Sequence, residues 1–254
     1  LIKDESIGNY LWDSDTEITY DYGNDDSIKL LENYNINSND INNLIDYSDN
    51  YNIIKTAAPE PNSCTNCGNN WARPSVLNTY LNETYYNTLS ADAKSMIGTT
   101  KYYLGGYGDA EITSDVMWQY ERKNDANRTG YYYGTNPVVQ SDASKKIALM
   151  YASDYGYGAS KECSKGLFSY NKDSNCITTN NWLDKSANTW LLPQSSDRSD
   201  SAFRVYSNGY VINYNNVNVT GNEYAVRPVL SLSSNVKISG GEGTSGSPYT
   251  LSIS

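Results

Sequence analysis

The four cysteines are the most reactive side chains of this sequence, and their spacing fits three kinds of chemistry. Two residues lie between Cys64 and Cys67, whereas Cys163 and Cys176 are farther apart. All four stand in polar sequence, unlike reduced structural cysteines, which pack among apolar residues. We therefore predict two local disulfides, Cys64–Cys67 and Cys163–Cys176, formed in an oxidising compartment. A four-cysteine zinc site and a redox pair stay open as alternatives, although a zinc ribbon needs two close pairs and a redox pair usually begins a helix.

The chain contains no histidine, and this absence removes many kinds of catalysis. Ser-His-Asp and Cys-His mechanisms, histidine-ligated metals and histidine proton shuttles are all excluded. No glycine-rich loop that could hold a phosphate is present, and carboxylate pairs are too common in an acidic chain to be diagnostic. We therefore predict a protein that is not an enzyme and carries no cofactor.

Acidic residues are concentrated at the start of the chain. Residues 1–55 hold twelve acids and three lysines, and the net charge of the whole chain is -10. Such a charge argues against nucleic acid as a partner. Asp13, Asp15 and Glu17 alternate as calcium ligands do, but no twelve-residue calcium loop with a central glycine and a terminal glutamate is present. We interpret them as a solvated acidic face, with calcium as the alternative.

A segment rich in tyrosine and asparagine near the C-terminus is the candidate binding surface. Asn208-Gly209 lies between two alternating runs, residues 203–206 and 210–214, and this pattern predicts a β-hairpin. Tyrosine provides a large contact area and asparagine provides adaptable hydrogen bonds. An ordinary polar hairpin with paired tyrosines is the alternative. The side chains assigned to the surface are Tyr206, Asn208, Tyr210, Asn213, Tyr214, Asn216, Asn218 and Asn222.

Helical patterns come before strand patterns along the chain. Apolar residues recur at helical spacing between Val76 and Tyr85, Ser90 can cap a second short helix, and residues 115–120 fit a third. Strands are expected at residues 146–151, 190–192, 203–206, 210–214, 225–232 and 249–253. This order is typical of an α+β domain.

The charge distribution divides the chain into two parts. We predict an acidic segment of short strands over residues 1–55, either separate or part of the same domain, and a main domain over residues 56–254. No stretch is long and apolar enough to span a membrane. The chain begins with Leu1, and we expect a leader or a membrane anchor upstream of it.

The later motifs, taken together, resemble a known group of domains. They are Leu149–Tyr157, Cys163 with Cys176, Asn181-Trp182-Leu183, Trp190–Pro193, Val226–Leu232 and Pro248–Leu251. This series is similar to an uncharacterised family of exported domains in Gram-positive gut bacteria, whose members often follow a type IV pilin-like N-terminus. That family resembles the C-type-lectin-like fold, which formylglycine-generating proteins and retroelement-diversified receptors also use.

The resemblance implies an α+β, C-type-lectin-like fold with early helices and a looped, mainly antiparallel sheet. It also implies a binding face between Trp190 and Arg227, which adds Trp190 to the candidate site. The expected function is ligand binding or adhesion at the bacterial cell surface, with a host or bacterial surface protein or a glycan as the partner. The alternative is a structural subunit that assembles into a type IV pilin-like filament.

Overall fold

The computed structural model describes residues 1–12, 76–123, 141, 145–177, 180–195, 201–216, 221–244 and 246–254. The predicted Cys64–Cys67 disulfide, the acidic residues Asp13, Asp15 and Glu17, and Asn218 lie outside these residues. Within them, helices and mixed sheets are both present, which confirms the α+β class.

The first helices of the described residues form one helical rod. It consists of α2 (Val76–Thr79), the π-helical η4 (Tyr80–Tyr85) and α3 (Tyr86–Thr88), as the apolar spacing predicted. Leu77 and Leu81 form its buried stripe. The next helix, α4 (Ala91–Met96), begins at Ser90, whose side chain accepts a hydrogen bond from the backbone N–H of Ala93. The predicted N-cap is thus confirmed.

Two more helices, α5 (Ser114–Arg122) and α6 (Ala152–Tyr157), pack against each other, and a 3-10 helix, η5 (Leu167–Lys172), follows. The predicted third helix corresponds to α5. The strand predicted at residues 146–151 was too long, and no helix was predicted after it. Only β2 (Ile147–Ala148) is a strand there, and α6 follows it.

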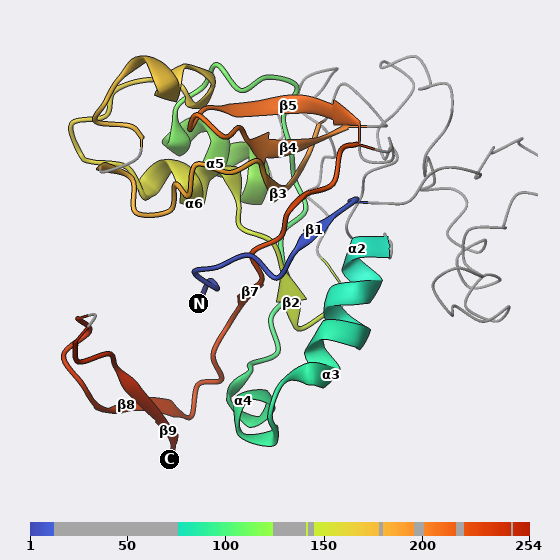
Figure 1. The fold of residues 1–254 in the computed structure, drawn as a ribbon, viewed down its shortest axis with the longest axis vertical. Coiled ribbons are helices and arrows are strands. Elements are labelled where there is room, and N and C mark those ends of the chain that lie inside the picture. The colour runs from blue at the N-terminus through green and yellow to red at the C-terminus, as the bar shows by residue number, and fades with distance from the viewer. Residues whose placement is uncertain are drawn as a thin grey trace, which may run out of the picture.

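The main sheet has five strands in the order β1-β6-β3-β4-β5. The strands are β1 (Asn9–Tyr10), β3 (Thr189–Gln194), β4 (Ser201–Val205), β5 (Val211–Asn216) and β6 (Tyr224–Ala225). Only β3 and β6 pair in parallel; the other neighbours are antiparallel. Helices α5 and α6 lie along one side of this sheet (Figure 1).

Side chains alternate between two hydrophobic clusters along β3, as the pleat of a strand requires. Leu191 belongs to the cluster shared with α5 and α6, which also contains Phe203 of β4. Trp190 and Leu192 belong to the other cluster, which includes the buried stripe of the helical rod. The sheet therefore holds the two helical layers together.

The first twelve residues share a core with late parts of the chain. β1 pairs with β6, and Trp12 is fully buried with its ring edge-on to Trp190, at a centroid distance of 5.7 Å. The indole N–H of Trp190 donates to the carbonyl of Tyr10 at 2.8 Å. This start of the acidic segment is therefore integrated into the fold.

The predicted strand over residues 225–232 is divided in two. β6 ends at Ala225, and β7 (Val229–Leu230) pairs with β2 in a separate two-stranded sheet. Pro228 lies between them. Since proline has no N–H to donate to a β-ladder, the pairing is interrupted there. Its carbonyl accepts from the backbone N–H of Lys3.

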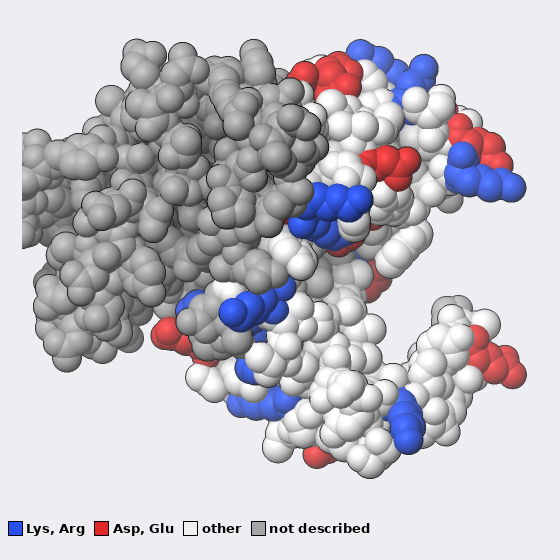
Figure 2. Space-filling view, turned by 180° about the vertical axis from the view of Figure 1, so that it is seen from behind, with Lys and Arg blue, Asp and Glu red and all other residues white. Residues whose placement is uncertain are grey.

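The chain closes with a hairpin of β8 (Val236–Gly240) and β9 (Thr250–Ile253), which pair only with each other. This hairpin stands apart from the five-stranded sheet (Figure 1) and projects from the body of the molecule (Figure 2). On the face shown in Figure 2, the described basic and acidic side chains are interspersed. Among the described residues, no helix is long and apolar enough to cross a membrane.

The predicted disulfide between Cys163 and Cys176 is present and closes the loop that contains η5. We expect the Cys163→Ser/Cys176→Ser variant to lose about 3 kcal/mol of unfolding free energy, because the cross-link restricts the unfolded chain. Urea unfolding of both proteins without reductant measures the difference. Equal midpoints and slopes would show that the disulfide adds nothing to stability.

Candidate functional site

The hairpin between β4 and β5 forms the frame of the candidate site. The backbone N–H of Tyr206 donates to the carbonyl of Tyr210 at 2.7 Å, and that of Gly209 donates to the carbonyl of Tyr206 at 2.8 Å. Gly209 has a φ of +92°, and a Cβ there would lie 2.3 Å from Cγ2 of Ile177. Only glycine fits this position without strain. The predicted Asn-Gly hairpin is confirmed.

A buried tyrosine of α6 ties this turn to the core. The hydroxyl of Tyr155 donates to the carbonyl of Gly209 at 2.8 Å, and the side chain of Tyr155 is fully buried. Burial in the core raises the pKa of Tyr155, so the hydroxyl keeps its proton and stays a donor. The hairpin is therefore fixed to the helical layer.

Five side chains form a continuous line across β3, β4, β6 and the hairpin, which we call the aromatic row. The rings of Trp190 and Tyr224 lie 4.7 Å apart, and the guanidinium of Arg204 lies 4.1 Å from the Tyr224 ring. The same guanidinium lies 4.5 Å from the ring of Tyr206, which stacks on Tyr210 at 4.9 Å. A cation thus lies between two pairs of aromatic rings.

Arg204 packs between these rings, with no acidic partner among the residues that the structure describes. Its side chain is 7% exposed, its Nε has no hydrogen-bond partner, and no ion pair to it is found among the described residues. Burial lowers the pKa of Arg204 from its ordinary value. The negative ring faces of Tyr206 and Tyr224 partly compensate for the lost hydration of the cation.

The structure brings several predicted residues to the surface of this region. Tyr214 is 49% exposed, and Tyr206 and Tyr210 are half-buried. Asn208 is exposed at the turn, and the Oδ1 of Asn222 accepts from the hydroxyl of Tyr224 at 2.7 Å. The tyrosines and these two asparagines therefore lie where a partner can reach them.

Two predicted residues do not lie on that surface. Trp190 is 1% exposed and belongs to the core, while Asn213 is 7% exposed and donates to the carbonyl of Gly108 at 2.8 Å. Trp190 is buried because the side of the sheet opposite α5 and α6 is also covered. Asn213 is buried because it shares the side of β5 that packs Val211 against the other cluster. Asn216 is described only by its backbone, which pairs with Ser201.

Sequence reasoning missed Arg204 and Tyr224 as members of the row. Strand alternation could have found Arg204, because it stands two residues before Tyr206 and so shares its side of β4. Tyr224 carried no such signal, since its place depends on the pairing of β6 with β3.

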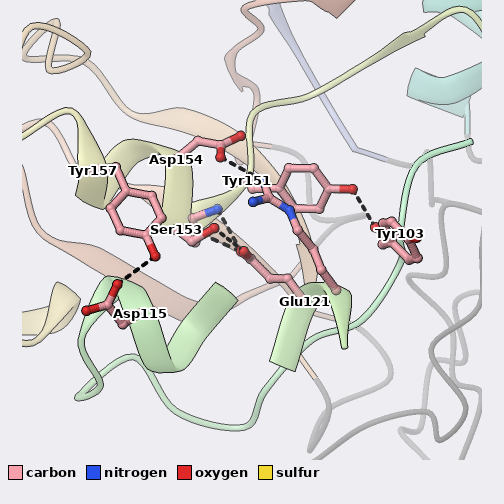
Figure 3. Close-up of polar contacts among 9 residues, drawn as sticks. Tyr103, Asp115, Glu121, Tyr151, Ser153, Asp154 and Tyr157 are labelled. Carbon is pink, nitrogen blue, oxygen red and sulfur yellow. Dashed lines mark hydrogen bonds and ion pairs between the residues drawn. The ribbon is translucent and has the colours of Figure 1, made fainter. Parts of the chain in front are cut away.

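A second polar group joins α5 to α6 (Figure 3). Glu121 of α5 is fully buried, and its Oε1 accepts from the backbone N–H groups of Ala152 at 2.9 Å and Ser153 at 3.2 Å. The hydroxyl of Ser153 hydrogen-bonds to Oε2. This carboxyl group satisfies the first N–H groups of α6, as a local N-cap residue does in other helices.

Four further contacts hold α6 and its N-cap residue Tyr151 in place (Figure 3). Arg122 forms an ion pair with Asp154 at 2.7 Å, and its guanidinium lies 3.9 Å from the ring of Tyr151. The hydroxyl of Tyr151 donates to the carbonyl of Tyr103 at 2.9 Å. The hydroxyl of Tyr157 donates to Asp115 at 2.7 Å. Among the described residues, no group of three or more acids or cysteines could hold a metal ion.

The fold and the site define an α+β domain that presents a tyrosine-rich hairpin beside a disulfide-closed loop. The chain belongs to the family described as a domain of unknown function, DUF6273, whose model matches residues 48–234. No curated protein and no solved structure matches the chain. The family match includes the whole aromatic row and the Glu121 group, and it ends before β8.

The buried carboxyl of Glu121 leads to a prediction about how the stability of the protein depends on pH. Burial raises the pKa of Glu121 to about 8, against the hydrogen bonds from Ser153, which lower it. The folded protein therefore binds a proton that the unfolded chain releases above about pH 4.5. We therefore expect the unfolding free energy to fall by about a few kcal/mol as the pH rises from about 5 to 8. The raised pKa of Glu121 sets the size of this fall.

Chemical unfolding at a series of pH values measures this slope. Glu121→Gln keeps the shape and the hydrogen bonds but has no proton to lose, so its slope should be flatter than that of the wild type. Glu111→Gln, at an exposed glutamate, should leave the slope unchanged. Parallel curves for the wild type and Glu121→Gln would contradict the assignment.

Proposed function

We propose that this chain is an extracellular, surface-displayed domain that binds a ligand or mediates adhesion. Its binding face consists of the solvent-accessible part of the aromatic row, together with Tyr214 and Asn208. The observation that carries the proposal is the aromatic row itself. Two stacked tyrosines lie beside a cation that has no acidic partner among the described residues. The hairpin that holds these tyrosines is anchored to the core.

The physical chemistry of this face suits recognition. Tyrosine, tryptophan and arginine carry most of the binding energy at protein interfaces. Rigid tyrosines lose little conformational entropy on binding. Because Gly209 is fixed to the core through Tyr155, the hairpin is already ordered before a partner arrives.

Two features support the location and the finer fold. The Cys163–Cys176 disulfide favours an oxidising, extracellular environment. A C-type-lectin-like arrangement is supported by the early helices, the looped mixed sheet and the pairing of β1 with the late strand β6. The partner that fits is a surface protein or a glycan.

The test is a binding screen of the full chain against glycan and surface-protein arrays. The Tyr206→Ala/Tyr210→Ala/Tyr214→Ala variant should lose at least about tenfold in affinity for any partner found, which corresponds to about 1.4 kcal/mol. The Tyr214→Ala single variant should show part of this loss without affecting the fold, because its ring is exposed. Tyr249→Ala, at an exposed tyrosine of the C-terminal hairpin region, is the matched control.

Circular dichroism and thermal unfolding establish that each variant is folded. A partner whose affinity is equal for the wild type and the triple variant would place binding elsewhere on the chain. If the folded wild type binds nothing but sediments as a growing polymer, the function is that of a filament subunit instead.

A further inference from the structure

A pocket with a volume of about 500 Å³ opens beside the C-terminal end of α6. Its walls include Ile2, Met150, Leu183 and Val229, which are apolar, and none of its lining residues belongs to the aromatic row. The volume falls within the usual range of small-ligand sites, which are mostly apolar with a few placed polar groups.

Two exposed aromatic side chains line the same pocket. Trp182 is 66% exposed and Tyr157 is 52% exposed, although side chains of this size are usually well covered. Their exposure on one site leaves two ring faces available to a ligand.

Trp182 is presented by an ordered segment rather than by a loose loop. Its backbone N–H donates to the carbonyl of Gly158 at 3.3 Å. The preceding residue, Asn181, is fully buried, and its amide donates to the carbonyl of Tyr155 at 3.1 Å. The indole is therefore exposed while its backbone is fixed to α6.

Asp154 supplies a carboxylate to the pocket, which Leu1, with an N-terminal amino group that interacts electrostatically with Asp154, also lines. The Oδ1 of Asp154 accepts from Arg122 at 2.7 Å, and its side chain is 40% exposed, so the carboxylate can still be reached from the pocket. Figure 3 shows Asp154 close to Tyr151, and the guanidinium that pairs with Asp154 lies 3.9 Å from the ring of Tyr151. The pocket thus contains an oriented acceptor whose charge is already balanced.

We propose that this pocket binds a neutral saccharide unit. The C–H face of the sugar ring packs on Trp182 or Tyr157, because the negative face of an aromatic ring attracts polarised C–H groups. A sugar hydroxyl donates to Oδ2 of Asp154, and a hydrogen bond to an ionised acceptor is stronger than a neutral one. A cationic ligand gains less here, because Arg122 already neutralises the carboxylate.

The experiment titrates the full chain with methyl glycosides of glucose, galactose, mannose and N-acetylglucosamine. Saturation-transfer NMR and tryptophan fluorescence detect binding, with a Kd on the order of 1 mM expected for a single sugar. Trp182→Ala and Asp154→Asn should each weaken binding about tenfold or more. Trp182→Ala should stay folded because the ring is exposed, and in Asp154→Asn the guanidinium of Arg122 keeps its contact with Tyr151.

Matched controls separate this site from the aromatic row. Tyr249→Ala and the triple tyrosine variant of the hairpin should bind the glycosides as the wild type does. Binding that is lost in the triple variant but kept in Trp182→Ala would overturn the pocket and support the row. Binding of the glycosides that is lost only in the pocket variants would support the pocket, even if the aromatic row binds no partner in the array screen.

Two other results would overturn the proposal. One is the absence of binding of every glycoside to the folded wild type up to about 20 mM, well beyond the expected Kd. The other is tighter binding of tetramethylammonium than of any glycoside, with loss in Trp182→Ala. That result would assign the pocket to a cation instead of a sugar.

Discussion

The carboxyl group of Glu121 holds together the parts of this molecule on which both candidate surfaces depend. A carboxyl buried without water is costly unless every polar atom finds a partner. Here the partners are the first N–H groups of α6 and the hydroxyl of Ser153, so the group fixes where α6 begins and how it faces α5. Removing such a group leaves buried donors without a partner.

The position of α6 affects both candidate surfaces. Tyr155 extends to the hairpin and holds the turn at Gly209. Asp154 and Tyr157, its neighbours on the same short helix, line the pocket near Trp182. Six residues of helix therefore connect the aromatic row with the pocket, although no residue belongs to both.

Local signals allowed much of this fold to be predicted from the sequence. The rod over residues 76–88, the N-cap at Ser90, the Asn208-Gly209 turn and the Cys163–Cys176 bridge each depend on residues close together in the chain. Helix α6 was missed because its capping group, Glu121, lies about thirty residues earlier. No local N-cap marks its start, since Tyr151 makes no capping hydrogen bond with its side chain.

The candidate site was predictable only in part, because it also depends on residues that are far apart in the chain. Alternation along β4 and β5 is enough to indicate that Phe203, Val205 and Val211 share one buried side. It could not show that the opposite side of the sheet is also covered, which depends on Trp12 and the helical rod. For this reason Trp190, assigned to the binding face from the sequence, lies in the core instead.

The turn of the hairpin is held by backbone atoms, and this has a consequence for how the protein can evolve. The bonds that close it join the N–H and carbonyl groups of Tyr206, Gly209 and Tyr210, and the anchor from Tyr155 also ends on a carbonyl. The shape of the turn therefore requires a glycine at position 209 but no particular side chain at position 208. Substitutions at position 208 can therefore change the chemistry of this tip at little cost to the backbone frame that holds it.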